Sequence, residues 1–278
     1  MPRSHHATFG LETCMFSPHQ MHPECSLRFA ASAAMGALAR QGSSLQSMLH
    51  EHGLGLVIVA SEVDYEEEAL TFFSGTEMTT EVRVSLRDDG RLLIFRARHS
   101  VPAGHAISIF VRARPVKLSG GAAMDAAPAA IEGALRACFA ADEIEAGVPS
   151  RVLQSLIDGW VAGGDELGAG EHSFFIGRSD CELADQWQFV RLPSLVATAR
   201  ERVALSDARA LSVSLKRPLR AFRGEYFRPM YLGDSGRIEF KAFRKEARTY
   251  FVYRVLGALV PGAPEDQRPV CAIAAEVF

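Results

Sequence analysis

The sequence lacks the features that mark membrane-spanning and secreted proteins. It has no run of about 18 or more apolar residues, the length that a membrane-spanning helix requires. The opening residues MPRSHHATFGLETC contain no apolar stretch of the roughly 7–15 residues typical of a secretion signal. We therefore expect a cytoplasmic protein that has no membrane partner.

An excess of basic charge and a regular cysteine pattern are also missing. The 30 Lys and Arg residues and 33 Asp and Glu residues give a formal net charge of -3, whereas nucleic-acid-binding domains usually carry clear basic excess. No nucleic-acid partner is expected. The cysteine count is odd and the spacing irregular, which predicts reduced thiols rather than a disulfide framework. These cysteines are Cys14, Cys25, Cys138, Cys181 and Cys271.

What the sequence does have is enough apolar material for two cores. Its 278 residues are 48% hydrophobic, which suits two domains of about 110–140 residues each. Alternation of apolar and polar residues marks one region from about Ala7 to Leu118 and another from about His172 to Phe278. We divide the chain into a first half, a connecting segment and a second half, at residues 1–118, 119–170 and 171–278.

The two halves repeat the same order of expected elements. Each opens with a strand-like run, at Ala7–Phe16 and His172–Leu183, and passes through a polar loop into one helix. The helices are predicted at Ser26–Arg40, where alanine dominates the apolar face, and at Pro193–Leu205, where proline suits the first turn. Alternating strands then follow, at Leu54–Tyr65, Glu77–Asp88, Arg91–Val101 and His105–Val116, and at Ala210–Arg223, Gly236–Ala247, Arg248–Leu259 and Pro269–Phe278.

The connecting segment is expected to be helical. It is rich in alanine and glycine, and it offers two helical candidates, at about Ala127–Ala141 and Ser150–Val161. The whole chain thus predicts an α+β protein with antiparallel sheets and one long helix in each half.

Two stretches of the second half resemble the hot-dog superfamily of thioesterases and dehydratases. SDCELADQW, followed by the helix at Pro193, is similar to a pattern of two spaced acidic residues before a helix. RPMYLGDSGRIEF is similar to a strand with a proline, a Gly-Asp turn and a return strand. The resemblance implies a double hot-dog fold, in which two antiparallel sheets each wrap around a central helix, and it allows a homodimer.

The resemblance also implies acyl thioester chemistry. A thioesterase acting on acyl-CoA or on an acyl carrier protein in a biosynthetic pathway is the first expectation. The chain length resembles a tandem acyltransferase/decarboxylase group of the leinamycin pathway, which is an alternative. A non-catalytic acyl-binding or partner protein is another. Dehydration is disfavoured, because the family's His-x-x-x-Gly-x-x-x-x-Pro stretch does not occur in this sequence.

Candidate catalytic residues lie in the loop before each predicted helix. By resemblance, Glu182 stands where the thioesterase pattern places its carboxylate, with Asp180 two residues earlier. The first loop departs from that pattern and offers His19 or His22 as a general base, with Glu24 as its partner or as the attacking carboxylate. Which half carries the chemistry is left open, and each acid has the alternative of a solvated surface residue.

A metal site is the alternative reading of the first loop. Cys14, His19, His22 and Cys25 are all possible zinc ligands, but their spacing is not that of the usual zinc fingers. We expect no metal and no cofactor, because free thiols are the commoner state of such cysteines.

A group of arginines in the second half is a candidate for phosphate binding. Arg217, Arg223 and Arg228 lie in LKRPLRAFRGEYFRP with aromatic residues between them. Guanidinium groups hold phosphates through paired hydrogen bonds. We expect these arginines to contact the phosphates of coenzyme A or of a phosphopantetheine arm, with an exposed polar strand face as the alternative.

Overall fold

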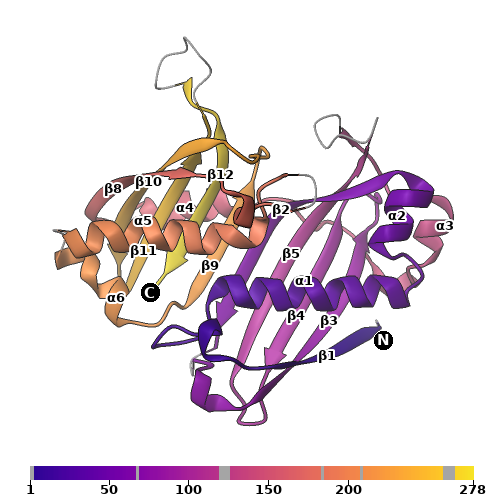
Figure 1. Ribbon diagram of the computed structural model, residues 1–278, viewed down its shortest axis with the longest axis horizontal. Coiled ribbons are helices and arrows are strands. Elements are labelled where there is room, and N and C mark those ends of the chain that lie inside the picture. Colours follow the sequence, from indigo (N-terminus) through magenta and orange to yellow (C-terminus); the bar gives the residue numbers. More distant parts are fainter. Residues whose placement is uncertain (1–2, 67–68, 119–125, 183–184, 207–208, 259–266) are drawn as a thin grey trace. The chain divides into compact units, whose positions relative to one another are not determined.

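The computed structural model describes residues 3–66, 69–118, 126–182, 185–206, 209–258 and 267–278. The chain forms two compact units, residues 1–150 and 151–278, and each contains an antiparallel sheet with a long helix on it (Figure 1). The boundary between them falls inside the segment 119–170 that was expected to connect the halves. None of the helices in the described ranges has the length and apolar character that crossing a membrane demands.

The sheet of the first unit has the strand order β1-β3-β4-β5-β2. All neighbours in this order are antiparallel. The strands are β1 Ser4–Gly10, β2 Leu54–Tyr65, β3 Glu77–Arg87, β4 Leu93–Ser100 and β5 Ala106–Lys117. Two short strands, β6 Ala127–Pro128 and β7 Ile144–Glu145, pair with β5 and β3. The strands predicted between Leu54 and Val116 are confirmed, with ends shifted by a few residues, whereas β1 covers only Ala7–Gly10 of the strand predicted at Ala7–Phe16.

The helix α1 (Pro23–Arg40) packs on one face of this sheet, chiefly against β3. Alanines make up much of its buried face, at Ala30, Ala33, Ala34 and Ala37. Their short side chains let the helix lie close to the strands. A second helix, α2 (Leu45–His52), begins at Ser44, whose side chain accepts a hydrogen bond from Ser47 N, and leads into β2.

The sheet of the second unit has the order β9-β12-β11-β10-β8, again antiparallel throughout. The strands are β8 Asp165–Phe175, β9 Ala221–Tyr226, β10 Ser235–Lys245, β11 Arg248–Leu256 and β12 Val270–Val277. The helix α5 (Leu192–Ser206) contacts β8, β9 and β10. It confirms the helix predicted at Pro193–Leu205.

The second sheet carries a helix on its other face as well. Ile273 and Ala275 pack with Leu153 and Ile157 of α4 (Leu153–Val161), whereas Glu276 bonds to α5. Because successive residues of a strand point to opposite faces, α4 and α5 cover opposite sides of β12. The carboxylate of Glu225 accepts hydrogen bonds from Val152 N and Leu153 N at the start of α4.

Two predicted elements are wrong. The helix expected over Ala127–Ala141 is replaced by β6, by a short helix α3 (Gly133–Ala137) and by a 3-10 turn, because Pro128 is paired with β5 and Gly133 takes a left-handed φ of 55°. The strand expected over Ala210–Arg223 is instead a 3-10 turn η7 (Arg209–Ser212) and a short helix α6 (Val213–Lys216), and β9 begins only after Pro218, which has no N–H for a strand ladder.

Candidate functional site

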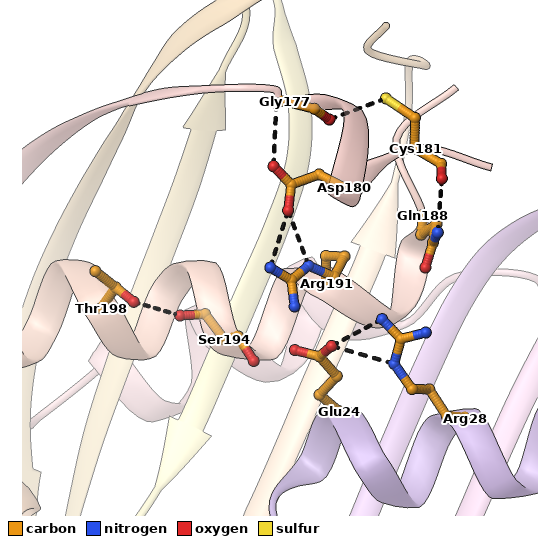
Figure 2. A network of polar contacts seen from close by, with 9 residues as sticks. All are labelled: Glu24, Arg28, Gly177, Asp180, Cys181, Gln188, Arg191, Ser194 and Thr198. Atoms are coloured by element: carbon orange, nitrogen blue, oxygen red, sulfur yellow. Dashed lines mark hydrogen bonds and ion pairs between the residues drawn. The ribbon is translucent and has the colours of Figure 1, made fainter. Parts of the chain in front are cut away.

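The loop before α5 is held together by Asp180. This residue ends a 3-10 turn, η5 (Arg178–Asp180). One carboxylate oxygen accepts a hydrogen bond from Gly177 N at 3.1 Å. The other accepts two from the guanidinium of Arg191, at 3.0 Å from Nε and 2.9 Å from NH2 (Figure 2). Asp180 therefore fixes the loop to the residue that precedes α5.

Further hydrogen bonds close the base of the same loop. Gln188 donates from its backbone N to Asp180 O and from its side-chain Nε2 to Cys181 O, at 2.9 and 2.7 Å. The Cys181 thiol lies 3.5 Å from Gly177 O (Figure 2). This contact links Gly177, which is bound to Asp180, with Cys181, which is bound to Gln188. These contacts fix the described residues of this loop beside the start of α5.

Glu182 belongs to the same loop. Its backbone N donates to Gln186 O at 2.9 Å, and its carbonyl accepts from Asp185 N at 3.0 Å. Asp185 takes a left-handed φ of 55° and forms an ion pair with Arg178. In the described ranges the carboxylate of Glu182 has no hydrogen-bond or ion-pair partner, unlike those of Asp180 and Asp185.

The charge state of Glu182 follows from its exposure. Loss of solvent raises the pKa of this carboxyl above its ordinary value, although the residue as a whole is exposed. Because the residue is exposed, we expect the carboxylate to be ionised at neutral pH. A side chain of this kind can accept a proton from water.

The first helix also begins beside titratable residues. His22 is the N-cap of α1, with an extended backbone and no side-chain cap, and Pro23 occupies the first helical position. Within the described residues the imidazole of His22 has no hydrogen-bond partner. Glu24 forms an ion pair with Arg28 at 2.9 Å, one helical turn later (Figure 2). His19 is half-buried, and its backbone N donates to Ser17 Oγ.

The loop that carries His19 is anchored to the first sheet. Tyr65 of β2 donates from its hydroxyl to Met21 O at 2.7 Å, and Met21 N donates to Leu70 O at 2.9 Å. Met21 is fully buried and Gln20 nearly so. This anchoring gives Tyr65 a structural contact, and it sets the position of His22 at the start of α1.

A buried histidine of the first unit was missed by the sequence analysis. His99 of β4 lies 2.9 Å from Ser26 O through Nε2 and 2.8 Å from Thr80 Oγ1 through Nδ1. A carbonyl oxygen only accepts, so Nε2 carries the proton and Nδ1 accepts from the Thr80 hydroxyl. Burial lowers the pKa of His99 to about 4. Its inward position in the alternation of β4 is the one signal that the sequence contains.

A buried ionic network of the second unit was missed as well. Arg200 of α5 donates from Nε to Glu276 of β12 at 2.7 Å, and the Tyr253 hydroxyl donates to the same carboxylate oxygen at 2.5 Å. All three residues are at most 4% exposed. Burial, followed by the charge of Glu276, raises the pKa of Tyr253 well above its ordinary value. The three residues lie far apart in the sequence, which explains why no local motif indicated them.

The three arginines proposed for phosphate binding do not come together. Arg217 is exposed after α6, and Arg228 is exposed beyond the other end of β9. A strand of this length extends about 20 Å, so one phosphate cannot contact both. Arg223 lies within β9 and donates from NH1 to Phe222 O at 3.0 Å.

The possible zinc ligands of the first loop do not form a metal-binding group. These are Cys14, His19, His22 and Cys25. Throughout the described ranges, no set of three or more His, Cys, Asp or Glu side chains is arranged to hold a metal ion. Burial raises the pKa of the Cys25 thiol to about 11. The Cys14 thiol is exposed and lies 3.8 Å from a carboxylate oxygen of Glu12.

Comparison with known proteins gives a match at the level of structure alone. No family profile matches the sequence, and no curated protein matches it. A solved structure described as an oleoyl thioesterase from Lactobacillus plantarum has a TM-score of 0.72 and 10% identity, over 99% of this chain and 95% of the other.

Two further thioesterases show the same likeness. An acyl-ACP thioesterase from Bacteroides thetaiotaomicron has a TM-score of 0.67 and 11% identity, over 99% of this chain and 97% of the other. The 12:0-ACP thioesterase from Umbellularia californica has a TM-score of 0.66 and 10% identity, over 99% and 93%. Together with the two antiparallel sheets and their long helices, these matches show that the chain has the double hot-dog fold that the sequence resemblance implied.

Proposed function

We propose that the protein hydrolyses an acyl thioester carried by coenzyme A or by an acyl carrier protein, and that Glu182 is its general base. The thioesterases of similar fold support the class of reaction. The observation that carries the choice of residue is the pairing of the loop acids. Asp180 and Asp185 each form an ion pair with an arginine. Within the described residues, the carboxylate of Glu182 has no such partner and is available to act as a base.

The proposed reaction needs one proton acceptor and one nucleophile. The Glu182 carboxylate takes a proton from a water molecule, and the oxygen of that water bonds to the thioester carbonyl carbon. The resulting oxyanion collapses as the carbon–sulfur bond breaks. The thiolate takes the proton from Glu182, which leaves a carboxylic acid, a free thiol and an ionised Glu182 for the next turnover.

Backbone N–H groups at the start of the second helix are the proposed oxyanion donors. A 3-10 turn, η6 (Phe189–Arg191), runs directly into α5, and its first hydrogen bond is from Arg191 N to Gln188 O. Within the described residues Phe189 N and Val190 N have no acceptor. The first N–H groups of a helix point along its axis, and its dipole favours negative charge at that end. Gln188 ties this end to the loop of Glu182.

The first helix is the second candidate location for the same reaction. The observation that favours it is the imidazole of His22, which has no partner among the described residues and stands at the N-cap of α1. His22 would act as the base there, and Glu24 and His19 would orient it or the substrate. Of the arginines expected to contact substrate phosphates, Arg228 is kept as a proposed contact, whereas Arg217 lies at the other end of β9 and Arg223 donates to Phe222 O.

A substrate panel with five single variants, Glu182→Gln, Asp180→Asn, His19→Ala, His22→Ala and Glu24→Ala, tests the proposal. Purified protein is assayed for thiol release from short-, medium- and long-chain acyl-CoA and acyl-carrier substrates. We expect Glu182→Gln to lower kcat by about a hundredfold or more, the usual loss for a missing general base. His19→Ala and Glu24→Ala should keep most of the activity, and Asp180→Asn should lose it only partly, through disorder of the loop.

Three results would contradict the proposal. Full activity of Glu182→Gln, with loss in His22→Ala or Glu24→Ala, would move the reaction to the first helix. Full activity in all variants would place the site elsewhere. Binding of acyl-CoA without thiol release by the wild type would indicate a non-catalytic acyl-binding protein.

A further inference from the structure

An exposed aromatic ring in the second unit lies against a fixed guanidinium. Phe227 follows β9 directly and is 41% exposed. The Arg151 guanidinium carbon lies 4.6 Å from the centre of its ring. Arg151 also donates to Tyr226 O, which holds the guanidinium over the ring. One part of the ring is thus supported by a cation, while much of its surface stays open.

The next residue supplies a second, available cation. Arg228 is exposed, and within the described residues its side chain forms neither a hydrogen bond nor an ion pair. Its backbone is nevertheless fixed, because Phe227 N and Arg228 N both donate to Cys271 O, at 2.8 and 3.2 Å. Pro229 follows and restricts Arg228 to extended conformations. We call Arg151, Phe227 and Arg228 the Phe227 platform.

We infer that the Phe227 platform binds the adenosine 3′-phosphate end of coenzyme A, an inference that rests on the proposed thioesterase function. A flat aromatic base stacks on an exposed phenylalanine ring, and an adjacent arginine provides paired donors for a phosphate. The platform combines both features on neighbouring residues. A carrier-bound phosphopantetheine arm has no adenine, so the inference selects coenzyme A thioesters as the substrate class.

The platform lies within reach of the proposed general base. Gln186 forms a β-bridge with Tyr231, and Trp187 N donates to Met230 O at 2.8 Å, so the segment after Arg228 is fastened to the loop of Glu182. Counting along these links, the Cα atoms of Glu182 and Arg228 are at most about 20 Å apart. An extended pantetheine arm with its phosphates spans about 15–20 Å by the same bond lengths. One molecule of acyl-CoA can therefore contact both.

Charge balance favours an anion at Arg228. Within the described residues, the Asp234 carboxylate accepts a hydrogen bond from Tyr231 N at 2.8 Å and forms no ion pair with Arg228. Exposed arginines on strands of both units are paired with acids, as in Arg83 with Glu81 and Arg254 with Glu239. Arg228 is not matched in this way, so its guanidinium is available to a ligand phosphate.

Two measurements on the full chain test the inference. The first is calorimetric binding of adenosine 3′,5′-bisphosphate, which needs no turnover. Phe227→Ala and Arg228→Gln should each weaken its binding about tenfold. Phe73→Ala, which removes a 94% exposed phenylalanine of the first unit, and Arg217→Gln, at the other end of β9, are the matched controls and should bind it like the wild type.

The second measurement compares acyl-CoA with the corresponding acyl-pantetheine. In Phe227→Ala and Arg228→Gln, KM should rise about tenfold for acyl-CoA and stay unchanged for acyl-pantetheine, with kcat unchanged for both, because remote contacts hold ground state and transition state alike. Equal effects on both substrates, a wild type that does not bind the nucleotide, or a preference for acyl-carrier protein over acyl-CoA would overturn the inference. Nucleotide binding without any hydrolysis would instead contradict the proposed function and leave the platform standing.

Discussion

At the scale of single residues, pairing decides which acid can react. Asp180, Glu182 and Asp185 lie within six positions of one loop. The sequence alone does not show which of their carboxylates is unpaired. The structure separates them, because Arg191 and Arg178 engage Asp180 and Asp185, and Glu182 keeps an unpaired carboxylate within the described residues. A residue's availability is thus set by partners several positions away.

The pH dependence of hydrolysis follows from the charge of Glu182. The base must be ionised, and desolvation raises the pKa of this carboxyl, so kcat should fall as the pH drops, with a midpoint above the ordinary glutamate value of about 4.3. A pH–rate profile from about pH 4 to 9 measures this. Glu182→Gln should lose the acidic limb, and a limb that persists in this variant would assign the titration to another group.

Asp180 is expected to act on stability rather than on chemistry. Asp180→Asn removes the charge that holds Arg191 and leaves Gly177 N with a weaker acceptor. Because both partners are partly exposed, at 22% and 33%, the loss should be only about 1 kcal/mol. Urea unfolding at neutral pH measures the loss, and Arg191→Gln is the matched variant. A stable Asp180→Asn protein with no activity would instead give this carboxylate a direct role.

At the scale of elements, polar contacts under each helix fix it to its sheet. His99 of β4, whose Nδ1 accepts from Thr80 of β3, donates to Ser26 O of α1, and Arg200 of α5 donates to Glu276 of β12. Both sets lie on faces that are otherwise apolar. They therefore fix the position of each helix along its sheet, which apolar packing alone leaves less well defined.

The buried imidazole should make the first unit sensitive to acid. The pKa of His99 is about 4 when folded and about 6.5 when unfolded. Between these two pH values the imidazole is protonated in the unfolded chain and neutral in the folded chain. Stability is then complete above about pH 6.5 and declines as the pH falls toward 4. We expect a loss of about 2 kcal/mol between pH 7 and 5 from this residue.

The comparison of wild type with His99→Gln isolates that contribution. His5 and His172 also have lowered pKa values and remain in both proteins. Denaturant unfolding at pH 7 and 5 should show a smaller pH effect in the variant, although the variant is less stable at pH 7. Identical pH effects in the two proteins would show that His99 takes up its proton without cost.

The ionic network under α5 should be costly to break and less costly to replace. Glu276→Ala leaves the buried charge of Arg200 without its partner, which should cost about 3–5 kcal/mol. The double variant Arg200→Met, Glu276→Leu removes both charges but leaves the buried Tyr253 hydroxyl without its acceptor, so it should recover only part of that loss. Chemical unfolding of the single and double variants measures this. A double variant no more stable than the single one would show that the network does more than balance its own charges.

Sequence patterns predicted the strands better than the segments between them. The alternation in Glu77–Asp88 predicted β3 to within one residue, because one buried face imposes a period of two on the side chains. The same period in ALSVSLK was misleading. There Leu211 and Ser214 are both buried, and the Ser214 hydroxyl donates to Leu211 O within a helical turn, which alternation cannot reveal.

At the scale of the whole molecule, the resemblance carried more information than composition. It placed Glu182 in the loop before a helix and implied two sheets with a helix on each, and both features are present. It could not supply Arg191 as the partner of Asp180, nor the bond between Arg200 and Glu276, because these pairs form only when the strands and helices have assembled. Side-chain pairing is therefore the part of the site that sequence patterns leave out.

The net charge of the protein makes salt a test of where its substrate binds. The chain as a whole is slightly acidic, at -3, so its overall field does not attract coenzyme A, and attraction must come from local arginines. Charges on the surface are screened over about 8 Å at physiological ionic strength. The kcat/KM for acyl-CoA should therefore fall several-fold between low and high salt, while that for uncharged acyl-pantetheine stays level. Arg228→Gln should remove most of the salt effect and Arg217→Gln should not, and a salt effect of equal size in both variants would assign the attraction to other arginines.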